Sequence, residues 1–246
     1  MLDIAVEPSE PAQSQRRKRF GRRWVFAWKM SARSTVLLMA FVSAALIFAL
    51  ILMDLSDLVL AEASFNGIEI VLPLLAGMSA ALIFAPDDEP ILELMMSSPR
   101  PLSWVLYERL TVLGLLQLGI GLAGSLIVAS QPSGEPYGQH VIRWLAPTVA
   151  MIGICLWASV WGRRNSYGVL MAVVICAGMA IANDVLLARF PDLWTVIFYV
   201  QPRDLPADQY LLNRLILIAI GVVLTALVFV RLRDSEKLLG TGDKRA

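Results

Sequence analysis

Residues Leu215–Val230 read LILIAIGVVLTALVFV, an apolar run in which Thr225 carries the only polar side chain. Because an α-helix rises about 1.5 Å per residue, a run of this length comes close to crossing the ~30 Å hydrocarbon core of a bilayer. Apolar and polar residues do not alternate in it, as they would in a membrane β-strand. The run is therefore typical of a membrane-spanning helix.

Five earlier segments have the same character, with few or no central charges. The six expected spans are Val36–Met53, Gly67–Ala85, Trp104–Ala129, Trp144–Trp161, Tyr167–Ala188 and Leu215–Val230. Hydrophobic residues make up 57% of the chain, whereas a soluble domain has about 45–50% apolar residues. Since only helices or closed barrels satisfy the backbone in lipid, we expect an all-α integral membrane protein with six transmembrane helices.

Lysine and arginine are divided unevenly between the two sides that six spans create. The N-terminal tail carries eight, the connection between spans two and three carries two, that between spans four and five carries two and the C-terminal tail carries five, whereas the opposite side carries four. The positive-inside rule places both termini in the cytoplasm, in a multi-pass protein of the cell (inner or plasma) membrane. We expect a disordered cytoplasmic tail at 1–21, one transmembrane domain at 22–230 and a cytoplasmic tail at 231–246.

The segment before the first span combines tryptophans with basic residues. Trp24 and Trp28 share one side of a helix, while Lys29 and Arg33 lie on another face. A basic helix of this kind suits the bilayer interface, so we expect an interfacial helix on the cytoplasmic surface. The alternative interpretation is that the segment simply extends the first span.

The connection between spans five and six contains an apolar stretch, Leu193–Val200, bounded by Pro191 and Pro202. This stretch is too short to cross a membrane and too apolar for a free loop. We therefore expect one or two short re-entrant helices that dip into the outer leaflet. The other outer connections, 54–66 and 130–143, are expected to be loops, and the second is rich in proline and glycine.

The inner connection between spans two and three is expected to hold a short cytoplasmic helix. Pro90 suits the first position of a helix, and the acidic residues before it suit the positive end of the helix dipole. Pro99 and Pro101 end the helix. Such a helix could dock a cytoplasmic partner, and an ordinary solvated loop is the alternative. The residues concerned are Ile91, Leu92, Glu93, Leu94, Met95, Met96, Pro99 and Arg100.

The order of these features resembles that in the membrane subunits of type-2 ATP-binding-cassette (ABC) exporters, and the resemblance covers most of the chain. The features are the interfacial segment, then the loop with Glu93 ahead of Pro99 and Arg100, then the re-entrant stretch. The resemblance implies that 91–100 is a coupling helix seated in a cytoplasmic ABC ATPase subunit. It also implies a pathway formed with a second permease copy or a related permease. The sequence has no phosphate-loop motif, so ATP-Mg would be used by the partner ATPase. This chain would then bind no cofactor and would not itself be an enzyme.

Small residues recur at every fourth position of the fifth expected span, at Gly168, Ala172, Cys176 and Ala180. A stripe of small side chains lets another helix approach closely. One interpretation is a possible subunit interface, and the other is packing within one chain.

Few polar residues fall within the expected spans. Gln117 lies well inside the third span, where it either has a function or bonds a neighbouring helix. Glu69, Asn183 and Asp184 lie near outer span ends, where we expect solvation, and His140 is expected to be exposed in an outer loop. These residues form neither a catalytic set nor a metal-ligand set.

The function that these features favour is export, with membrane lipids but no nucleic acid as further partners. The alternative is a non-catalytic membrane scaffold or accessory subunit, in which no pathway forms. A secondary carrier would more often show two matching halves and charges at mid-membrane, and we find neither pattern.

Overall fold

The computed structural model describes Val42 and residues 61–86, 102–129, 137–189, 195–199 and 205–233. Within these ranges the chain is helical apart from short connections and the segment 195–199, and it contains no strand. The helices are α3 (Ala61–Ile83), α5 (Leu102–Ala129), α6 (Tyr137–Gly162), α7 (Asn165–Arg189) and α8 (Ala207–Arg233). Each coincides with one of the last five expected spans, which confirms the helical class for these segments. The first expected span and the interfacial helix, Val42 excepted, lie outside the described residues.

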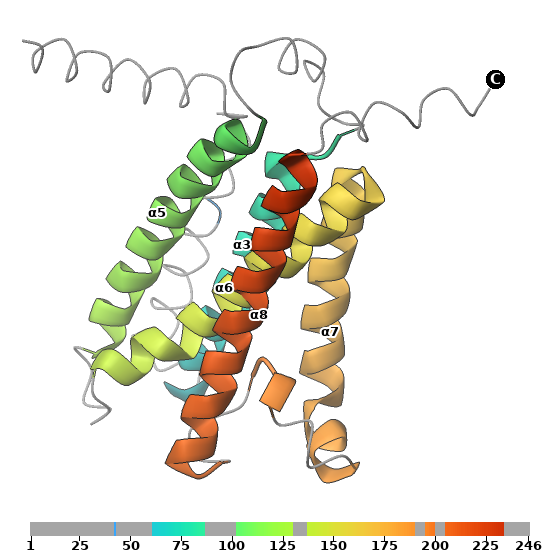
Figure 1. Cartoon of the computed structure of the whole chain (residues 1–246). Helices are drawn as coiled ribbons and strands as arrows, with labels where there is room; N and C mark the ends of the chain where they lie inside the picture. The colour runs from blue at the N-terminus through green and yellow to red at the C-terminus, as the bar shows by residue number, and fades with distance from the viewer. Residues whose placement is uncertain are drawn as a thin grey trace, which may run out of the picture.

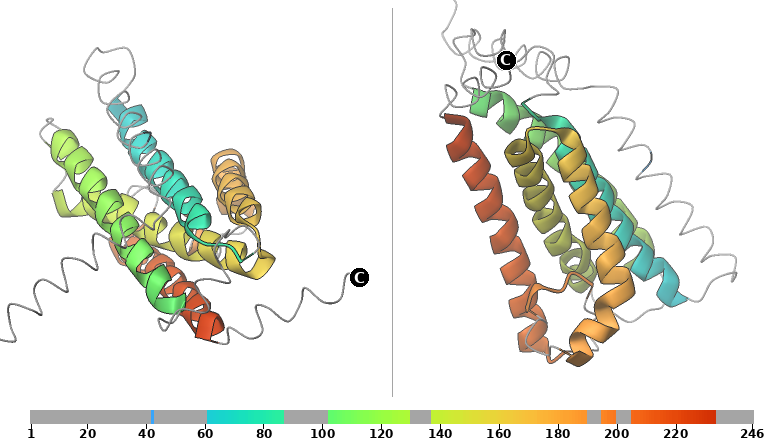
Figure 2. Two further views of the ribbon diagram at one scale, coloured as in Figure 1. Left: turned by 90° about the horizontal axis from the view of Figure 1, so that it is seen from above. Right: turned by 90° about the vertical axis from the view of Figure 1, so that its right-hand side faces the viewer.

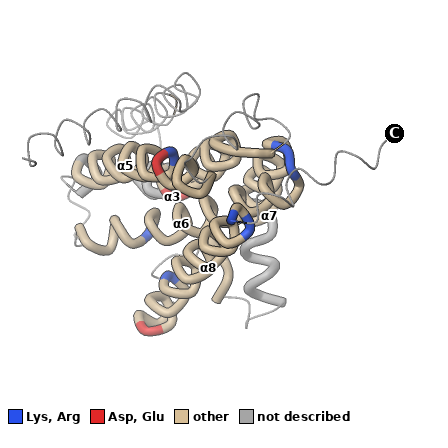
Figure 3. The backbone as a smooth tube through the Cα atoms, turned by 45° about the horizontal axis from the view of Figure 1, so that its top comes forward, with Lys and Arg blue, Asp and Glu red and all other residues tan. Residues whose placement is uncertain are grey.

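Three of the described helices, α5, α6 and α8, are long and apolar enough to cross a membrane. The helices α3 and α7 contribute the shorter apolar stretches Ile68–Ile83 and Asn165–Met179. Figure 3 shows that charged residues are sparse along the described helices. The composition of the bundle is therefore that of a helical membrane protein.

Consecutive helices run in opposite directions, so that their ends gather at two ends of the bundle (Figure 1). At one end α3, α6 and α8 finish and α5 and α7 begin. We call this the basic end, because it carries the described arginines Arg109, Arg163, Arg164, Arg231 and Arg233. At the other end α5 and α7 finish and α3, α6 and α8 begin, and we call it the opposite end.

The helix α6 forms the centre of the bundle. It contacts each of the other described helices and is the most buried of the three long apolar helices. Figure 1 and Figure 2 show α6 crossing obliquely, from beside α5 at the opposite end to beside α7 at the basic end. Its buried side chains include Ala146, Ala150 and Met151. Small residues on this helix allow its neighbours to approach closely.

The helices α3, α6 and α8 begin earlier than the expected spans. Residues 137–143 and 207–214 are helical, although both ranges were expected to belong to outer loops, and α3 begins within the expected loop 54–66. The expectation was wrong at these positions because it excluded segments that contain charged residues. Arg143 and Arg214 are in fact buried, and a buried, partnered charge does not end a helix.

The backbones of α6 and α8 meet at two facing glycines, Gly153 and Gly221. A Cβ atom added to Gly153 would lie 2.7 Å from the Cα atom of Gly221, and one added to Gly221 would lie 2.8 Å from the backbone nitrogen of Ala150. Real Cβ atoms essentially never come this close to backbone atoms. Only glycine at both positions permits this crossing.

We predict that Gly153→Ala and Gly221→Ala each lower the free energy of unfolding by about 1–3 kcal/mol, because the added methyl group forces two backbones apart. The measurement is the thermal unfolding midpoint of the purified protein in detergent. Gly114→Ala in α5 is the control, because an added Cβ there meets nothing within 4 Å. Equal midpoints for Gly153→Ala and Gly114→Ala would contradict the crossing.

Candidate functional site

A buried ion pair joins α3 to α6 near the opposite end of the bundle. The Arg143 guanidinium of α6 pairs with the carboxylate of Glu69 in α3, and both side chains are only 8% exposed. Glu69 was expected to be solvated at an outer span end, and this expectation was wrong. Two charges removed from water are tolerated when they neutralise one another, so the pair fixes how α3 and α6 face each other.

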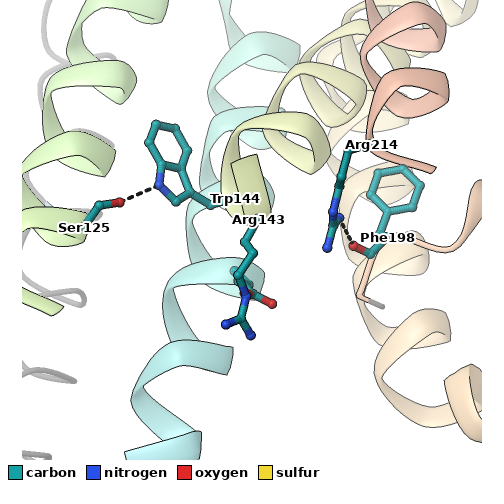
Figure 4. Close-up of polar contacts among 6 residues, drawn as sticks. Ser125, Arg143, Trp144, Phe198 and Arg214 are labelled. Carbon is teal, nitrogen blue, oxygen red and sulfur yellow. Dashed lines mark hydrogen bonds and ion pairs between the residues drawn. The ribbon is translucent and has the colours of Figure 1, made fainter. Parts of the chain in front are cut away.

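A second buried arginine anchors the segment 195–199 to α8. Nη1 of Arg214 donates a hydrogen bond to the backbone oxygen of Phe198 at 2.8 Å, as Figure 4 shows. The side-chain amide of Asn213 donates to the backbone oxygen of Ile197 at 3.0 Å. Arg214 also lies over the ring of Tyr210, 4.8 Å from its centroid. Two neighbouring residues of α8 therefore satisfy two consecutive carbonyl groups of an irregular segment.

The segment 195–199 is the described part of the expected re-entrant stretch. It begins with a short helical turn at Thr195 and Val196 and continues without regular structure. Ile197 and Phe198 are buried, and Tyr199 makes a hydrogen bond with the Cys176 thiol of α7, with 3.0 Å between oxygen and sulfur. The segment is thus held on one side by α8 and on the other by α7.

These groups lie at the same end of the bundle. Arg214 covers the ring of Tyr210 and bonds to the backbone of Phe198, which directly precedes Tyr199. The Glu69–Arg143 pair lies at the same end, where α3 and α6 begin. We call Glu69, Arg143, Tyr199, Tyr210 and Arg214 the polar cluster. It brings together residues from α3, α6, α8 and the 195–199 segment. Charged groups inside a membrane bundle commonly mark transport pathways or gates, so the polar cluster is the candidate functional site.

The helix α5 is attached beside this cluster through Trp144. The indole nitrogen donates a hydrogen bond to the hydroxyl oxygen of Ser125 at 2.7 Å, and the ring lies against Gly121 (Figure 4). Trp144 is one of the largest fully buried side chains. Because Trp144 directly follows Arg143, one turn of α6 contacts both α3 and α5.

His140 was expected to be exposed, but it is buried in the first turns of α6, one turn before Arg143. The expectation failed because residues 130–143 were assigned to a loop.

No sequence motif identified Arg143 or Arg214 as site residues. The pattern that could have indicated them is their position, because each arginine directly precedes an apolar run. A helix predicted from such a run can begin several residues earlier and include the arginine.

Gln117 is placed in the interior of α5, where it is 1% exposed. Neither its amide nitrogen nor its amide oxygen has a hydrogen-bond partner among the described residues. The bond to a neighbouring helix, one of the two interpretations of this residue, is therefore not made to any of the described helices.

The small-residue stripe of α7 faces other helices of the same chain at its described positions. Gly168, Ala172 and Cys176 are buried, and Gly168 lies against Ser159 and the backbone of Cys155 in α6 and against Ala81 in α3. At these described positions the stripe therefore packs against helices of its own chain. The structure gives no side-chain description at Ala180, Asn183 and Asp184, and the expected coupling residues lie outside the described residues.

Comparisons with known proteins gave no match: no family model, no curated protein and no solved structure matches the chain at a significant level. The resemblance to type-2 ABC exporters therefore rests on the order of the sequence features.

We predict that removing one partner of the Glu69–Arg143 pair costs more than removing both. Arg143→Met or Glu69→Leu alone should lower the free energy of unfolding by about 3–5 kcal/mol, because each leaves a buried charge without its partner. The double variant should recover most of this loss, since two apolar side chains can replace a buried pair. Thermal unfolding of all four proteins in one detergent measures the coupling. Additive losses would show that the two residues do not act as a pair.

Proposed function

We propose that the chain is the transmembrane permease subunit of a type-2 ABC exporter. In this proposal six helices cross the cell membrane, with both termini and the basic end of the bundle in the cytoplasm. The pathway forms between two permease subunits, which are either two copies of this chain or this chain and a related one. A separate cytoplasmic ABC ATPase hydrolyses ATP, and the chain itself catalyses no reaction.

The observation that carries the proposal is the connection of α3 to α5 at the basic end. Arg109 in α5 is buried, and its Nη1 donates a hydrogen bond to the backbone oxygen of Ile83, the last residue of α3, at 2.8 Å. The loop that contains Glu93 thus leaves and rejoins the bundle at neighbouring points. Because the two points are tied together, a force that an ATPase applies to this loop acts on both helices.

The polar cluster supports the proposal from the opposite end. A re-entrant segment that is held by hydrogen bonds to α8 and α7 can close an outer mouth without exposing its own carbonyl groups to lipid. These bonds break and re-form at lower cost than a packed apolar core, since each contributes about 1 kcal/mol net. An outer closure of this kind is a requirement of an exporter that opens to one side at a time.

A non-catalytic scaffold is the alternative function, and co-purification with an ATPase distinguishes the two. The full-length tagged protein is purified in a mild detergent, and the proteins that remain bound are identified by mass spectrometry. A stoichiometric soluble ATPase with a phosphate loop is expected. Its absence, when a control exporter keeps its own ATPase under the same conditions, would contradict the proposal.

We predict that Glu93→Ala weakens ATPase binding or coupling about thirtyfold or more. Losing one partner of a hydrogen-bonded charge pair at an interface costs about 2 kcal/mol or more. The measurement is ATPase turnover and subunit retention in the purified complex. Asp208→Ala is the matched control, because it removes an exposed carboxylate at the opposite end of the bundle. If Glu93→Ala behaves like Asp208→Ala, the loop is not the coupling element.

We also predict that Gln117→Leu raises stability but lowers the ATPase turnover of the complex. A buried amide without a partner costs about 1–3 kcal/mol, which leucine removes, whereas a second conformation that uses the amide would lose its bond. Thermal unfolding and turnover are measured on the same preparation. Thr111→Val is the control, since among the described residues the Thr111 hydroxyl donates to the backbone oxygen of Tyr107 in its own helix. Unchanged turnover for Gln117→Leu would assign the amide no role in the cycle.

A further inference from the structure

An aromatic and basic cluster occupies the basic end of α6 and α8, away from the polar cluster. Trp161, in the last turn of α6, is 57% exposed and stacks on Trp157, with ring centroids 5.5 Å apart. The guanidinium carbon of Arg231 in α8 lies 4.0 Å from the centroid of the Trp161 ring. The indole thus holds the arginine by a cation–π contact while most of the indole remains accessible.

The turn after α6 adds further arginines beside Trp161. Arg163 adopts a left-handed backbone conformation with φ of 66°, and the backbone nitrogen of Tyr167 donates a hydrogen bond to the backbone oxygen of Arg164 at 3.2 Å. The ring of Tyr167 lies against Gly162, which leaves no room for a Cβ atom there. The turn is therefore held in one conformation, in which Arg164 is exposed.

Three arginines at this end have no acidic partner among the described residues. No carboxylate in the described part of the chain forms an ion pair with Arg164, Arg231 or Arg233. Arg231 uses one face of its guanidinium on the indole, and its N–H donors lie in the plane of the guanidinium rather than on that face. A planar fork of donors matches the oxygens of a phosphate group.

Apolar side chains continue from this cluster along the surface of α8. Val223, Leu227 and Val230 lie on one face at helical spacing, and all three are at least half exposed. A ligand that carries a phosphate beside Arg231 can therefore lay hydrocarbon chains along the same helix. This combination of a charged head and adjoining apolar surface fits an anionic phospholipid.

We propose that Trp161, Arg231 and Arg164 form a binding site for the headgroup of an anionic phospholipid. The site lies at the end of helices that are apolar enough to span a bilayer, at the depth where tryptophan and arginine meet headgroups. Each arginine near an anionic headgroup contributes about 1 kcal/mol, which corresponds to roughly fivefold in affinity. The site requires neither an ATPase nor a transport pathway, so it stands apart from the proposed function.

The test uses lipids that quench tryptophan fluorescence when they are in contact with the ring. The full-length protein is reconstituted in vesicles that contain phosphatidylglycerol and phosphatidylcholine in equal amounts, with either the first or the second lipid dibrominated, and the Trp161 signal is obtained by difference from Trp161→Phe. We expect phosphatidylglycerol to bind beside Trp161 several-fold more strongly than phosphatidylcholine. Arg231→Gln should reduce this preference about fivefold, and Arg231→Lys should keep part of it.

Trp104 provides a matched control at the same end of the bundle. It is 46% exposed, but its indole nitrogen donates a hydrogen bond to the carboxylate of Glu108 at 2.9 Å, so its surroundings are acidic rather than basic. The signal obtained by difference from Trp104→Phe should show no preference for phosphatidylglycerol. Equal quenching of Trp161 by the two lipids, or an unchanged preference in Arg231→Gln, would overturn the proposal. A variant that fails to reconstitute is replaced by Arg164→Gln, which changes an exposed side chain of the same site.

Discussion

The ion pair between Glu69 and Arg143 sets the arrangement on which the rest of the bundle depends. An apolar interior offers no water to a charge, so each of the two residues must face the other. This requirement fixes the rotation of α6 relative to α3. The next residue, Trp144, is then directed to Ser125 and Gly121 of α5, and Gly153, farther along α6, meets the glycine of α8. One buried pair thus specifies the neighbours of the central helix.

The same constraint explains the irregular segment 195–199. Its carbonyl groups cannot bond to lipid, and a segment this short cannot satisfy them by forming a helix of its own. Asn213 and Arg214 supply the donors from α8, and Tyr199 is held by Cys176 of α7. The hydrogen bond from Arg214 that holds the segment also places it near Tyr210, because the Arg214 guanidinium lies over the Tyr210 ring. A polar cluster at one end of an apolar bundle is therefore a consequence of how the segment is anchored.

The sequence was sufficient to locate the helices but not the site. Long apolar runs identify helices because lipid permits few other structures, and the five described helices coincide with expected spans. Their beginnings were misplaced because Arg143 and Arg214 are polar in any hydropathy scale, whereas in the folded chain they are buried with partners far away in sequence. Glu69 and Arg143 are separated by two connections and a helix, and no local pattern specifies which carboxylate meets which arginine. Gln117, in contrast, was recognisable, since an amide within a long apolar run is conspicuous.

The two ends of the bundle treat arginine in different ways, and this difference bears on orientation. Arg143 and Arg214 at the opposite end are turned inward, where a carboxylate and a backbone carbonyl bind them. They are structural groups and present little charge to a membrane surface. At the basic end, Arg164, Arg231 and Arg233 form no ion pair within the described part of the chain. Of the described arginines at the basic end, only Arg109 is turned inward, toward the backbone oxygen of Ile83. When the three inward-turned arginines are set aside, the remaining described arginines at the basic end are Arg163, Arg164, Arg231 and Arg233, and Arg189 remains at the opposite end. A simple count of arginines therefore understates the asymmetry that the positive-inside rule uses. This strengthens the proposed orientation with an argument that is independent of the family resemblance.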